Sequence, residues 1–481
     1  MRLFEILLLL INVPALGWSM LSRWPKPKWL LFFSFLAIPF FILHLCLEKS
    51  RWQMTPAYLV IVILLIVHFK LLTRSTINGF KSWRMILVDL VGLALLVCAA
   101  MLSFVFPVFK FPAPTGPYLV GTVTLHLTDN SRSETFSKNP KDRRELMVQL
   151  WYPVEPSCHG KPEHYLANLG DAEAARRQAY GLRFSQLNLV ETHSIPDAAL
   201  SPQQPDYPIL IFSPSWGGSR NQNTYQAEEL ASHGFIVAGI DHTYCTGVTV
   251  MPGGRIIFSG PELDVDFSSD EGVQRYLHIA PIQARLRAQD AIFVLNQLAE
   301  LNVHDVTGRF IHRLDLKRVG IFGHSFGGTV AAEACLLDNR FKAGMNMDGM
   351  IFGDAVEQRV KQPFLFMSSD EVRPSAEEIA HSSYAKLDDR SFKVQDAFFR
   401  LNGGYNLIIK KAKHSNFSDT ALFSPLSRFT DAGTISAYRC ARIVDDYTLA
   451  FFEKYLNKAP SPLFDLPSQS YSEITLEKYG K

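Results

Sequence analysis

Hydrophobic residues follow two different patterns along this chain, and the change between them falls near residue 110. Before it, apolar residues form four long runs that are almost free of polar positions. After it, short runs rich in β-branched and aromatic residues alternate with stretches in which apolar residues recur at helical spacing. Long uninterrupted runs are typical of membrane-spanning helices, whereas the alternation indicates strands and amphipathic helices. The sequence therefore predicts two structurally different regions.

The four long runs cover residues 3–21, 29–47, 58–72 and 85–109. Each is near the roughly 20 residues that a helix needs to cross a bilayer core, the third run being the shortest. Tryptophans flank the runs, and their amphipathic rings favour the headgroup level. A soluble helical bundle, the alternative, would need polar faces that these runs lack. We therefore predict that residues 1–110 form a multi-pass membrane region with four transmembrane helices.

The first run also raises the alternative of a cleaved signal peptide. Arg2 and a leucine run favour a signal peptide, but Glu5 stands early in the run and no small-x-small cleavage site follows it. We therefore predict that the first run is a retained helix.

The basic residues of the linkers predict a topology. Seven of them belong to the linkers after the first and third runs: Arg23, Lys26, Lys28, Lys70, Arg74, Lys81 and Arg84. Four belong to the opposite side: Arg2, Lys49, Arg51 and Lys110. The positive-inside rule puts the more basic side in the cytoplasm. Both ends of the membrane region, and the catalytic domain after it, are therefore predicted to lie outside the cytoplasm.

Residues 111–117 contain three prolines and a glycine, which predict a stiff linker. Strands are predicted at residues 118–127, 146–152, 207–212, 235–240, 317–322, 342–347, 363–367 and 406–411. Helices are predicted at residues 225–233, 279–301, 327–337 and 435–456. The first two strands resemble an antiparallel hairpin, and the rest of the alternation predicts a mostly parallel sheet with helices on both faces. Residues 118–481 are thus predicted as one α/β domain, with residues 154–205 and 250–278 as loops or cap insertions.

Composition and charge narrow the class of protein. The 481 residues carry 48 Lys and Arg against 46 Asp and Glu, but residues 1–110 hold 11 basic and only 3 acidic side chains, so the remainder is acidic. A hydrophobic content of 47% excludes a disordered chain, and six cysteines exclude a disulfide-dense scaffold. There is no basic tract of the kind that binds nucleic acid, and no His, Cys and carboxylate spacing typical of a metal site. We therefore predict no nucleic-acid partner, no metal and no cofactor.

The candidate chemistry begins at Gly323-His-Ser-Phe-Gly327, which follows a predicted strand and precedes a predicted helix. This is the G-x-S-x-G pattern of a nucleophile elbow, in which a strained turn lifts the serine hydroxyl above the edge of the sheet. The two glycines let the strand and the helix approach closely. Ser325 is therefore the predicted nucleophile, and an ordinary turn serine is the alternative.

A serine hydroxyl is a poor nucleophile until a base takes its proton. In a fold of this kind the base follows both the serine and the acid in the chain. His414 meets this requirement, because it lies in the loop directly after the predicted strand at residues 406–411. The other histidine after Ser325, His381, lies in a polar helical stretch and is interpreted as a solvated surface residue.

Two positions compete for the acid that orients the base. Asp348 ends the predicted strand at residues 342–347, and Asp370, with Glu371 beside it, follows the strand at residues 363–367. Both positions lie at the carboxyl edge of the sheet, where the active sites of open parallel sheets are found. The residues alone leave this choice open.

The loop after the strand at residues 207–212 reads Ser-Pro-Ser-Trp-Gly-Gly-Ser-Arg and is the expected source of one oxyanion donor. Gly217 and Gly218 allow the backbone to approach a substrate closely, although an ordinary glycine-rich turn has the same composition. The start of the helix after Ser325 supplies the other donor. We predict the backbone N–H groups of Trp216 and Phe326 as the oxyanion pair.

Seven motifs occur along the chain in this order: residues 116–118, 150–153, 212–220, 230–237, 323–328, 345–350 and 414–419. Together they resemble the secreted-type platelet-activating factor acetylhydrolase family, a branch of the α/β-hydrolases. The resemblance covers roughly residues 112–460. It implies an α/β-hydrolase fold and calcium-independent cleavage of short or oxidised acyl chains from phospholipids. The four long apolar runs lie outside it.

The resemblance also implies roles for particular residues. In that family the acid follows the strand after the elbow, which favours Asp348 over Asp370. The other site residues of the family fall on positions already singled out: Ser325, His414, Trp216 and Phe326. Two departures bear on substrate preference. Pro214-Ser215 stands where the oxyanion loop of the family usually begins with His-Gly, and Trp216 is bulkier than the usual aliphatic residue.

The sequence therefore predicts a membrane-anchored serine ester hydrolase with a Ser-His-Asp triad, whose substrate is a lipid or a small ester. A general carboxylesterase or amidase acting on an exported small molecule, peptide or polyester is one alternative. A membrane scaffold with an inactive hydrolase domain is an alternative of another class, since a fold does not fix a function. An inactive relic is expected to have lost part of the triad, whereas all three residue types are present here.

Overall fold

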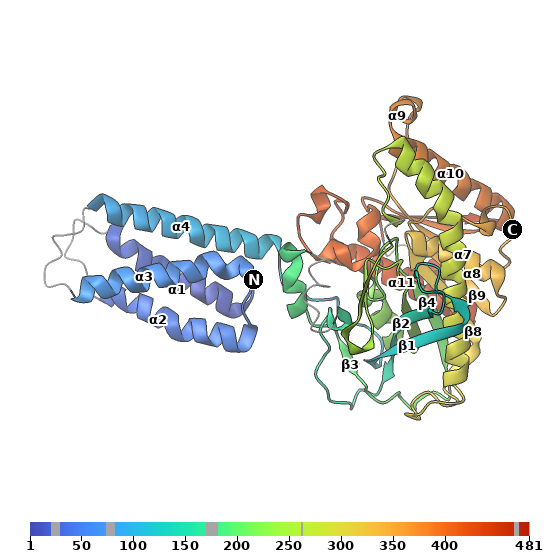
Figure 1. Ribbon diagram of the computed structural model, residues 1–481, viewed down its shortest axis with the longest axis horizontal. Helices are drawn as coiled ribbons and strands as arrows, with labels where there is room; N and C mark the ends of the chain where they lie inside the picture. The colour runs from blue at the N-terminus through green and yellow to red at the C-terminus, as the bar shows by residue number, and fades with distance from the viewer. Residues whose placement is uncertain (21–28, 74–81, 170–180, 261–262, 466–470, 481) are drawn as a thin grey trace. The chain divides into compact units, whose positions relative to one another are not determined.

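The computed structural model describes residues 1–20, 29–73, 82–169, 181–260, 263–465 and 471–480 (Figure 1). The chain forms two compact units. Unit 1 contains Met1–Phe109, Leu182–Val190 and Phe423–Leu426, and unit 2 contains Lys110–Gly181, Glu191–Leu422 and Ser427–Lys481. Unit 1 therefore takes two short segments from the region that the sequence predicts as a single domain.

Unit 1 contains four apolar helices. They are α1 (Leu3–Met20), α2 (Trp29–Leu43), α3 (Thr55–Thr73) and α4 (Ser82–Val105). A π-helical turn, His44–Glu48, extends α2, and a short 3₁₀ turn, Trp52–Met54, precedes α3. The four long apolar runs are thus helical, as predicted. Some of the basic linker residues used for the topology lie outside the described residues: Arg23, Lys26, Lys28, Arg74 and Lys81.

The membrane prediction is only partly matched by the lengths of these helices. Among the described residues, one stretch, Ile86–Val105 of α4, is both long and apolar enough to cross a membrane. The apolar stretches Leu3–Leu16, Phe32–Glu48 and Trp52–Val67 are shorter than 18 residues. The prediction of four transmembrane helices is therefore not confirmed.

Unit 1 buries polar groups and exposes apolar ones. Glu5 is fully buried and accepts two hydrogen bonds of 2.7 Å from the Arg51 guanidinium, and the buried His44 ring lies 2.6 Å from the Tyr58 hydroxyl. Large apolar side chains are exposed on every helix of the unit: Leu3, Leu10, Phe32, Phe69, Met101 and Phe104. A helical bundle in water has the opposite arrangement, because its apolar stripe faces the core.

Unit 2 contains a ten-stranded sheet with the order β12-β11-β10-β9-β8-β4-β5-β2-β1-β3. Its strands are β1 (Leu119–Ser133), β2 (Arg143–Val154), β3 (Ser194–Pro196), β4 (Tyr207–Ser213), β5 (Ile236–Asp241), β8 (Leu314–His324), β9 (Phe341–Met347), β10 (Phe364–Ser369), β11 (Gly404–Ile409) and β12 (Ile474–Tyr479). The six strands from β11 to β5 are parallel, while β12 and β2 join them antiparallel. β1 pairs antiparallel with β2, so the predicted opening hairpin is confirmed.

Helices cover both faces of this sheet (Figure 1). The main ones are α6 (Thr224–Ser232), α7 (Asp270–Leu301), α8 (Phe326–Leu337), α10 (Ser383–Asn402) and α11 (Ala437–Leu456). The alternation along β8 explains the two layers, since successive side chains of a strand point to opposite faces. Val319 and Ile321 belong to the core that α7 and α8 close, whereas Phe322 packs on Phe452 of α11. The predicted mostly parallel α/β architecture is confirmed.

The predicted linker, residues 111–117, is fixed along α6. Thr115 N–H donates to Glu229 at 2.7 Å, and Gly116 N–H donates to Ser232 Oγ at 3.0 Å. A Cβ atom on Gly116 would lie 2.0 Å from the Ser232 carbonyl oxygen, so only glycine allows this approach. The segment is therefore held against α6 as part of unit 2.

Several described elements of unit 2 differ from the prediction, among them the short strand β3 inside the predicted loop 154–205, α7, α10 and β12. α7 begins at Asp270, so residues 270–278, predicted as loop or cap, are helical; Ser269 caps the helix by accepting from Gly272 N–H. Most of α10 and the edge strand β12 were not predicted. α10 is rich in charged residues and has few fully buried positions, so its apolar pattern is weak. β12 depends on pairing with β11, which is not a local property of its sequence.

Candidate active site

The G-x-S-x-G motif forms the predicted sharp turn between a strand and a helix. β8 ends at His324, α8 begins at Phe326, and Ser325 between them has φ 56° and ψ −122°, a strained conformation for a residue other than glycine. A Cβ atom on Gly323 would lie 2.2 Å from the backbone of Gly327, and one on Gly327 would lie 1.9 Å from the Ser213 carbonyl oxygen. Both glycines are therefore required for the strand and helix to meet.

Asp348 follows β9 directly and lies beside this turn. It also has a positive φ, 58°. Its carboxylate accepts from Ser369 N–H at 2.7 Å and from His414 Nδ1 at 2.8 Å. Burial alone would raise the pKa of Asp348, but the hydrogen bonds from His414 and Ser369 outweigh burial and hold this pKa below its ordinary value. Asp348 is therefore an anion that orients one nitrogen of His414.

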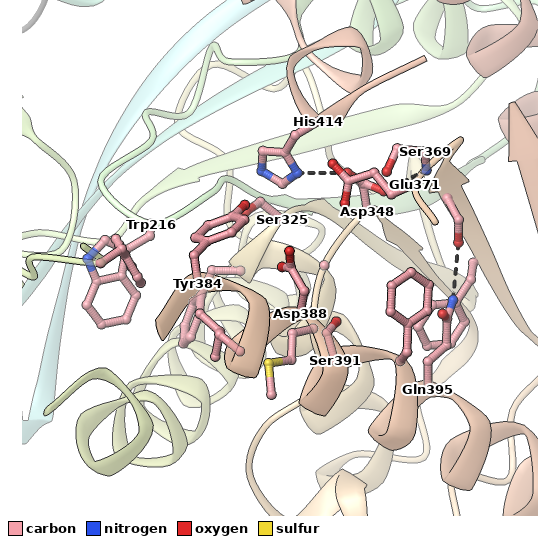
Figure 2. A pocket seen from close by; sticks show the side chains of 18 of the residues that line it. Trp216, Ser325, Asp348, Ser369, Glu371, Tyr384, Asp388, Ser391, Gln395 and His414 are labelled. Atoms are coloured by element: carbon pink, nitrogen blue, oxygen red, sulfur yellow. Dashed lines mark hydrogen bonds and ion pairs between the residues drawn. The ribbon is translucent and has the colours of Figure 1, made fainter. Parts of the chain in front are cut away.

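His414 begins a short 3₁₀ turn, His414–Phe417, in the loop after β11. With Nδ1 on Asp348, Nε2 is the nitrogen left to act as a base, and Figure 2 shows the ring between Asp348 and Ser325. Burial would lower the pKa of His414, but the hydrogen bond and the charge of Asp348 outweigh burial and raise it. No described hydrogen bond joins Ser325 Oγ to His414; such bonds often tighten only once substrate is bound.

The alternative residues of the sequence prediction lie elsewhere. Asp370 accepts from Lys411 N–H at 2.8 Å and makes no contact with His414. Glu371 lines the pocket and has no described hydrogen bond to the His414 ring. His381 is exposed on α9 (Ala376–His381), where its Nδ1 lies 2.8 Å from the Glu377 carbonyl oxygen. The structure therefore brings Asp348, and not Asp370, to His414.

Trp216 and Phe326 lie next to each other, Phe326 directly after Ser325 at the start of α8. Their ring centres are 4.9 Å apart, and both residues line the same pocket as Ser325. Within the described part of the chain, neither backbone N–H donates to an acceptor. The Trp216 indole N–H is fixed by the Leu263 carbonyl oxygen at 3.0 Å, and Gly217 has a φ of 72° that favours glycine. Two free amides thus remain where the sequence predicts the oxyanion pair.

A chain of hydrogen bonds that the sequence did not reveal connects the three parts of the site. Ser215 N–H donates to the Gln222 side-chain oxygen at 2.8 Å, and the Gln222 amide donates to His324 Nδ1 at 2.9 Å. His324 Nε2 then donates to the His414 carbonyl oxygen at 3.1 Å. Burial lowers the pKa of His324 to about 3, so the ring is neutral, with one donor and one acceptor nitrogen. His324 occupies a variable position of G-x-S-x-G, so the motif carried no signal for it.

These residues line a pocket of about 360 Å³ (Figure 2). Much of its wall is aromatic: Trp216, Phe267, Tyr276, Phe326, Phe366, Tyr384 and Phe392. α10 contributes Asp388, which Figure 2 shows across the pocket from His414. Burial, together with the charge of Asp348, raises the pKa of Asp388 to about 6. No lysine or arginine is among the described lining residues, so the pocket is apolar with an acidic wall.

Comparisons with known proteins identify a family that this chain matches. The family model "Platelet-activating factor acetylhydrolase, isoform II" matches residues 104–461. A "Probable 1-alkyl-2-acetylglycerophosphocholine esterase" of Arthroderma benhamiae is 27% identical, over 79% of this chain and 96% of the relative. The platelet-activating factor acetylhydrolase of Bos taurus is 26% identical, over 72% of this chain and 77% of the relative.

Among solved structures, a ferulic acid esterase from Streptomyces cinnamoneus superposes with a TM-score of 0.61 at 29% identity. The match covers 77% of this chain and 99% of that esterase. The α/β-hydrolase-like fold that the sequence resemblance implies is therefore confirmed.

Proposed function

The chain belongs to the platelet-activating factor acetylhydrolase, isoform II, family and is an enzyme that hydrolyses esters. We propose that it uses a serine nucleophile and that its substrates are phospholipids with short or oxidised acyl esters. The observation that carries this proposal is the 2.8 Å hydrogen bond between His414 Nδ1 and Asp348, beside the strained turn that holds Ser325 in the same pocket. Strain of this kind at a functional site favours a pre-organised nucleophile.

The proposed reaction follows the two-step route of serine esterases. Ser325 Oγ attacks the ester carbonyl carbon while His414 Nε2 takes the hydroxyl proton, and Asp348 stabilises the resulting imidazolium. The N–H groups of Trp216 and Phe326 donate to the carbonyl oxygen as its negative charge develops. Collapse of this intermediate breaks the ester bond, and the leaving alcohol takes the proton from His414. Water then cleaves the acyl-enzyme by the same steps in reverse order.

The size and lining of the pocket support a short acyl chain. A pocket of about 360 Å³ is at the lower end of the roughly 300–1,000 Å³ found for small-molecule sites. Its aromatic wall favours an apolar acyl group, and its acidic wall disfavours an anionic group near Ser325. The printed names of the relatives, an acetylglycerophosphocholine esterase and platelet-activating factor acetylhydrolases, point to the same class of substrate.

The substrate proposal is tested with the full chain in detergent micelles or nanodiscs. We expect a phospholipid with an acetyl group at the second position to be cleaved at least about 100-fold faster, by kcat/KM, than one with a palmitoyl group, a discrimination that pocket contacts can supply. A fluorophosphonate probe should attach to Ser325, as read by peptide mass spectrometry. Equal rates for both lipids, or faster cleavage of soluble nitrophenyl esters or amides, would favour a general carboxylesterase or amidase. Absence of both turnover and label would favour an inactive scaffold.

We further propose that unit 1 is a membrane region of four helices, with unit 2 outside the cytoplasm. The exposed apolar side chains and the buried Glu5–Arg51 pair support this proposal, since charged groups in membrane bundles face the interior and pair with one another. Ile86–Val105 is long enough to span by itself. In membranes prepared from expressing cells, the chain should stay in the pellet after washing with alkaline carbonate. Release into the supernatant would contradict membrane integration.

A further inference from the structure

A buried arginine lies behind the two proposed oxyanion donors and takes no part in the reaction described above. Arg287, on α7, is 1% exposed. Its guanidinium carbon lies 5.2 Å from the centre of the Trp216 ring and 4.8 Å from that of Phe326. Resting on the proposed function, we propose that Arg287 is the positioning residue of the oxyanion hole: its planar cation holds the two donor residues in register.

The charge of Arg287 has no direct counter-ion among the described residues. Nη1 donates to the Ser215 carbonyl oxygen at 3.3 Å and Nη2 to the Cys245 carbonyl oxygen at 3.5 Å, both long bonds, and Nε has no partner. The described ion pairs include none to Arg287. An unpaired buried cation costs folding free energy. A buried cation that costs folding free energy and lies beside a candidate active site is a candidate for a functional role there.

The acid one helical turn along α7 is already engaged. Asp290 accepts two bonds from Arg144, at 3.1 and 2.7 Å, and one from His242 Nδ1 at 2.9 Å. His242 Nε2 in turn accepts from Ser213 Oγ at 3.0 Å. This second Ser-His-Asp chain is at most 1% exposed and reaches no substrate. It fixes the end of β4 to α7 at Ser213, the first residue of the oxyanion loop.

Arg287 contacts two parts of the site that come from different segments of the chain. Trp216 belongs to the loop after β4, and Phe326 begins α8 after β8. A guanidinium can lie against two aromatic rings while donating from its edge to Ser215, whereas a lysine ammonium offers a point charge without a plane. By packing against both rings, Arg287 fixes the spacing of the Trp216 and Phe326 backbone N–H groups. The bulk of Trp216, one of the two departures from the family pattern, supplies the second ring.

The cation lies against the two residues whose N–H groups are proposed to hold the developing negative charge. In the ground state the ester carbonyl is neutral, and in the tetrahedral intermediate its oxygen is an anion. A fixed positive charge behind the donors therefore stabilises the transition state more than the bound substrate. Loss of Arg287 should lower kcat, with little change in KM.

The test compares Arg287→Met and Arg287→Lys in the full chain, with a soluble acetyl ester and a short-chain phospholipid. We expect Arg287→Met to lower kcat by roughly 10- to 100-fold, somewhat less than the loss of a whole oxyanion donor, with KM within twofold of wild type. Arg287→Lys keeps the charge and should recover part of this loss. Affinity for a trifluoromethyl ketone, which mimics the tetrahedral intermediate, should fall by the same factor as kcat/KM.

Arg309→Met is the matched control, because Arg309 also lies over two rings, those of Tyr152 and Phe310, at 5.5 and 5.8 Å. It precedes β8, at the opposite end of the strand from Ser325, so its loss should change thermal stability but not kcat. If Arg287→Met does not fold, Trp216→Leu keeps the backbone N–H, should lower kcat, and should make a further Arg287→Lys change nearly silent.

The inference is overturned if Arg287→Met keeps kcat and ketone affinity within twofold of wild type, or if Arg309→Met loses as much of both. It is equally overturned if Trp216→Leu leaves kcat unchanged. These outcomes leave wild-type activity intact, whereas failure of the proposed function appears as absence of ester hydrolysis in the wild-type chain itself.

Discussion

Replacing Ser325 with alanine is expected to lower kcat for ester hydrolysis by about 10⁶-fold, the scale seen when a serine hydrolase loses its nucleophile. Without Oγ no acyl-enzyme forms, and His414 has no proton to accept. KM should change little, because the pocket wall and the oxyanion amides remain. Ser325 Oγ has no described hydrogen bond, so the melting temperature should stay within about 2 °C of wild type, as for a substitution that removes no packing or polar partner.

Ser213→Ala is the informative control for this variant, because Ser213 belongs to the other Ser-His-Asp chain of unit 2. Its hydroxyl is fully buried, so a fluorophosphonate cannot reach it. Labelling should therefore be lost in Ser325→Ala and kept in Ser213→Ala. Retention of more than about 1% of kcat by Ser325→Ala would contradict the assignment of the nucleophile, since background catalysis by the oxyanion hole alone is far weaker.

Replacing Asp348 with asparagine is expected to lower kcat by about 10⁴-fold, because the amide no longer fixes the useful tautomer of histidine or stabilises its cation. The pH profile gives a second readout. Hydrogen bonding to Asp348 raises the pKa of His414 against the opposing effect of burial, and a protonated His414 cannot act as a base. The acidic limb of kcat/KM should therefore lie above the ordinary histidine value of about 6.5 in the wild type and move to lower pH in Asp348→Asn.

Asp370→Asn is the matched control, since Asp370 was the competing acid in the sequence. Its carboxylate accepts from Lys411 N–H and makes no contact with His414, so kcat should stay within about twofold of wild type, as for a surface substitution. A larger loss in Asp370→Asn than in Asp348→Asn would reverse the assignment.

The turn that holds Ser325 and the loop that holds His414 could be predicted from the sequence because both follow from local rules. A serine between two glycines, after a strand and before a helix, has few structural solutions, and the 1.9 Å approach that Gly327 permits shows why. His414 follows a late strand, so its side of the sheet could be predicted. The choice between Asp348 and Asp370 could not, because both follow strands of the same sheet. One unused signal was Gly349, where a Cβ atom would lie 1.9 Å from the Ser325 carbonyl oxygen.

The supporting residues of the site could not be predicted at all. Gln222, His324 and Arg287 contact other parts of the site over long separations in the chain, from 39 positions between Arg287 and Phe326 to 102 positions between Gln222 and His324. Neither their residue type nor their spacing differs from that of ordinary buried polar residues. In unit 1, hydropathy predicted the helices closely but not how they meet a membrane, because length and composition do not determine insertion.

The discontinuity of unit 1 has a consequence for the order of biosynthesis. Phe184 packs on Phe106 and Phe423, and Phe109 stacks on Phe423, so unit 1 is complete only once residues 423–426 exist. A ribosome adds about 5–20 residues per second, so roughly 15 to 60 s pass between synthesis of Phe109 and synthesis of Phe423. During that interval the four helices of unit 1 exist, but Phe109 and Phe184 lack their contacts with Phe423. Unit 1 can therefore be completed only after most of unit 2 has been synthesised.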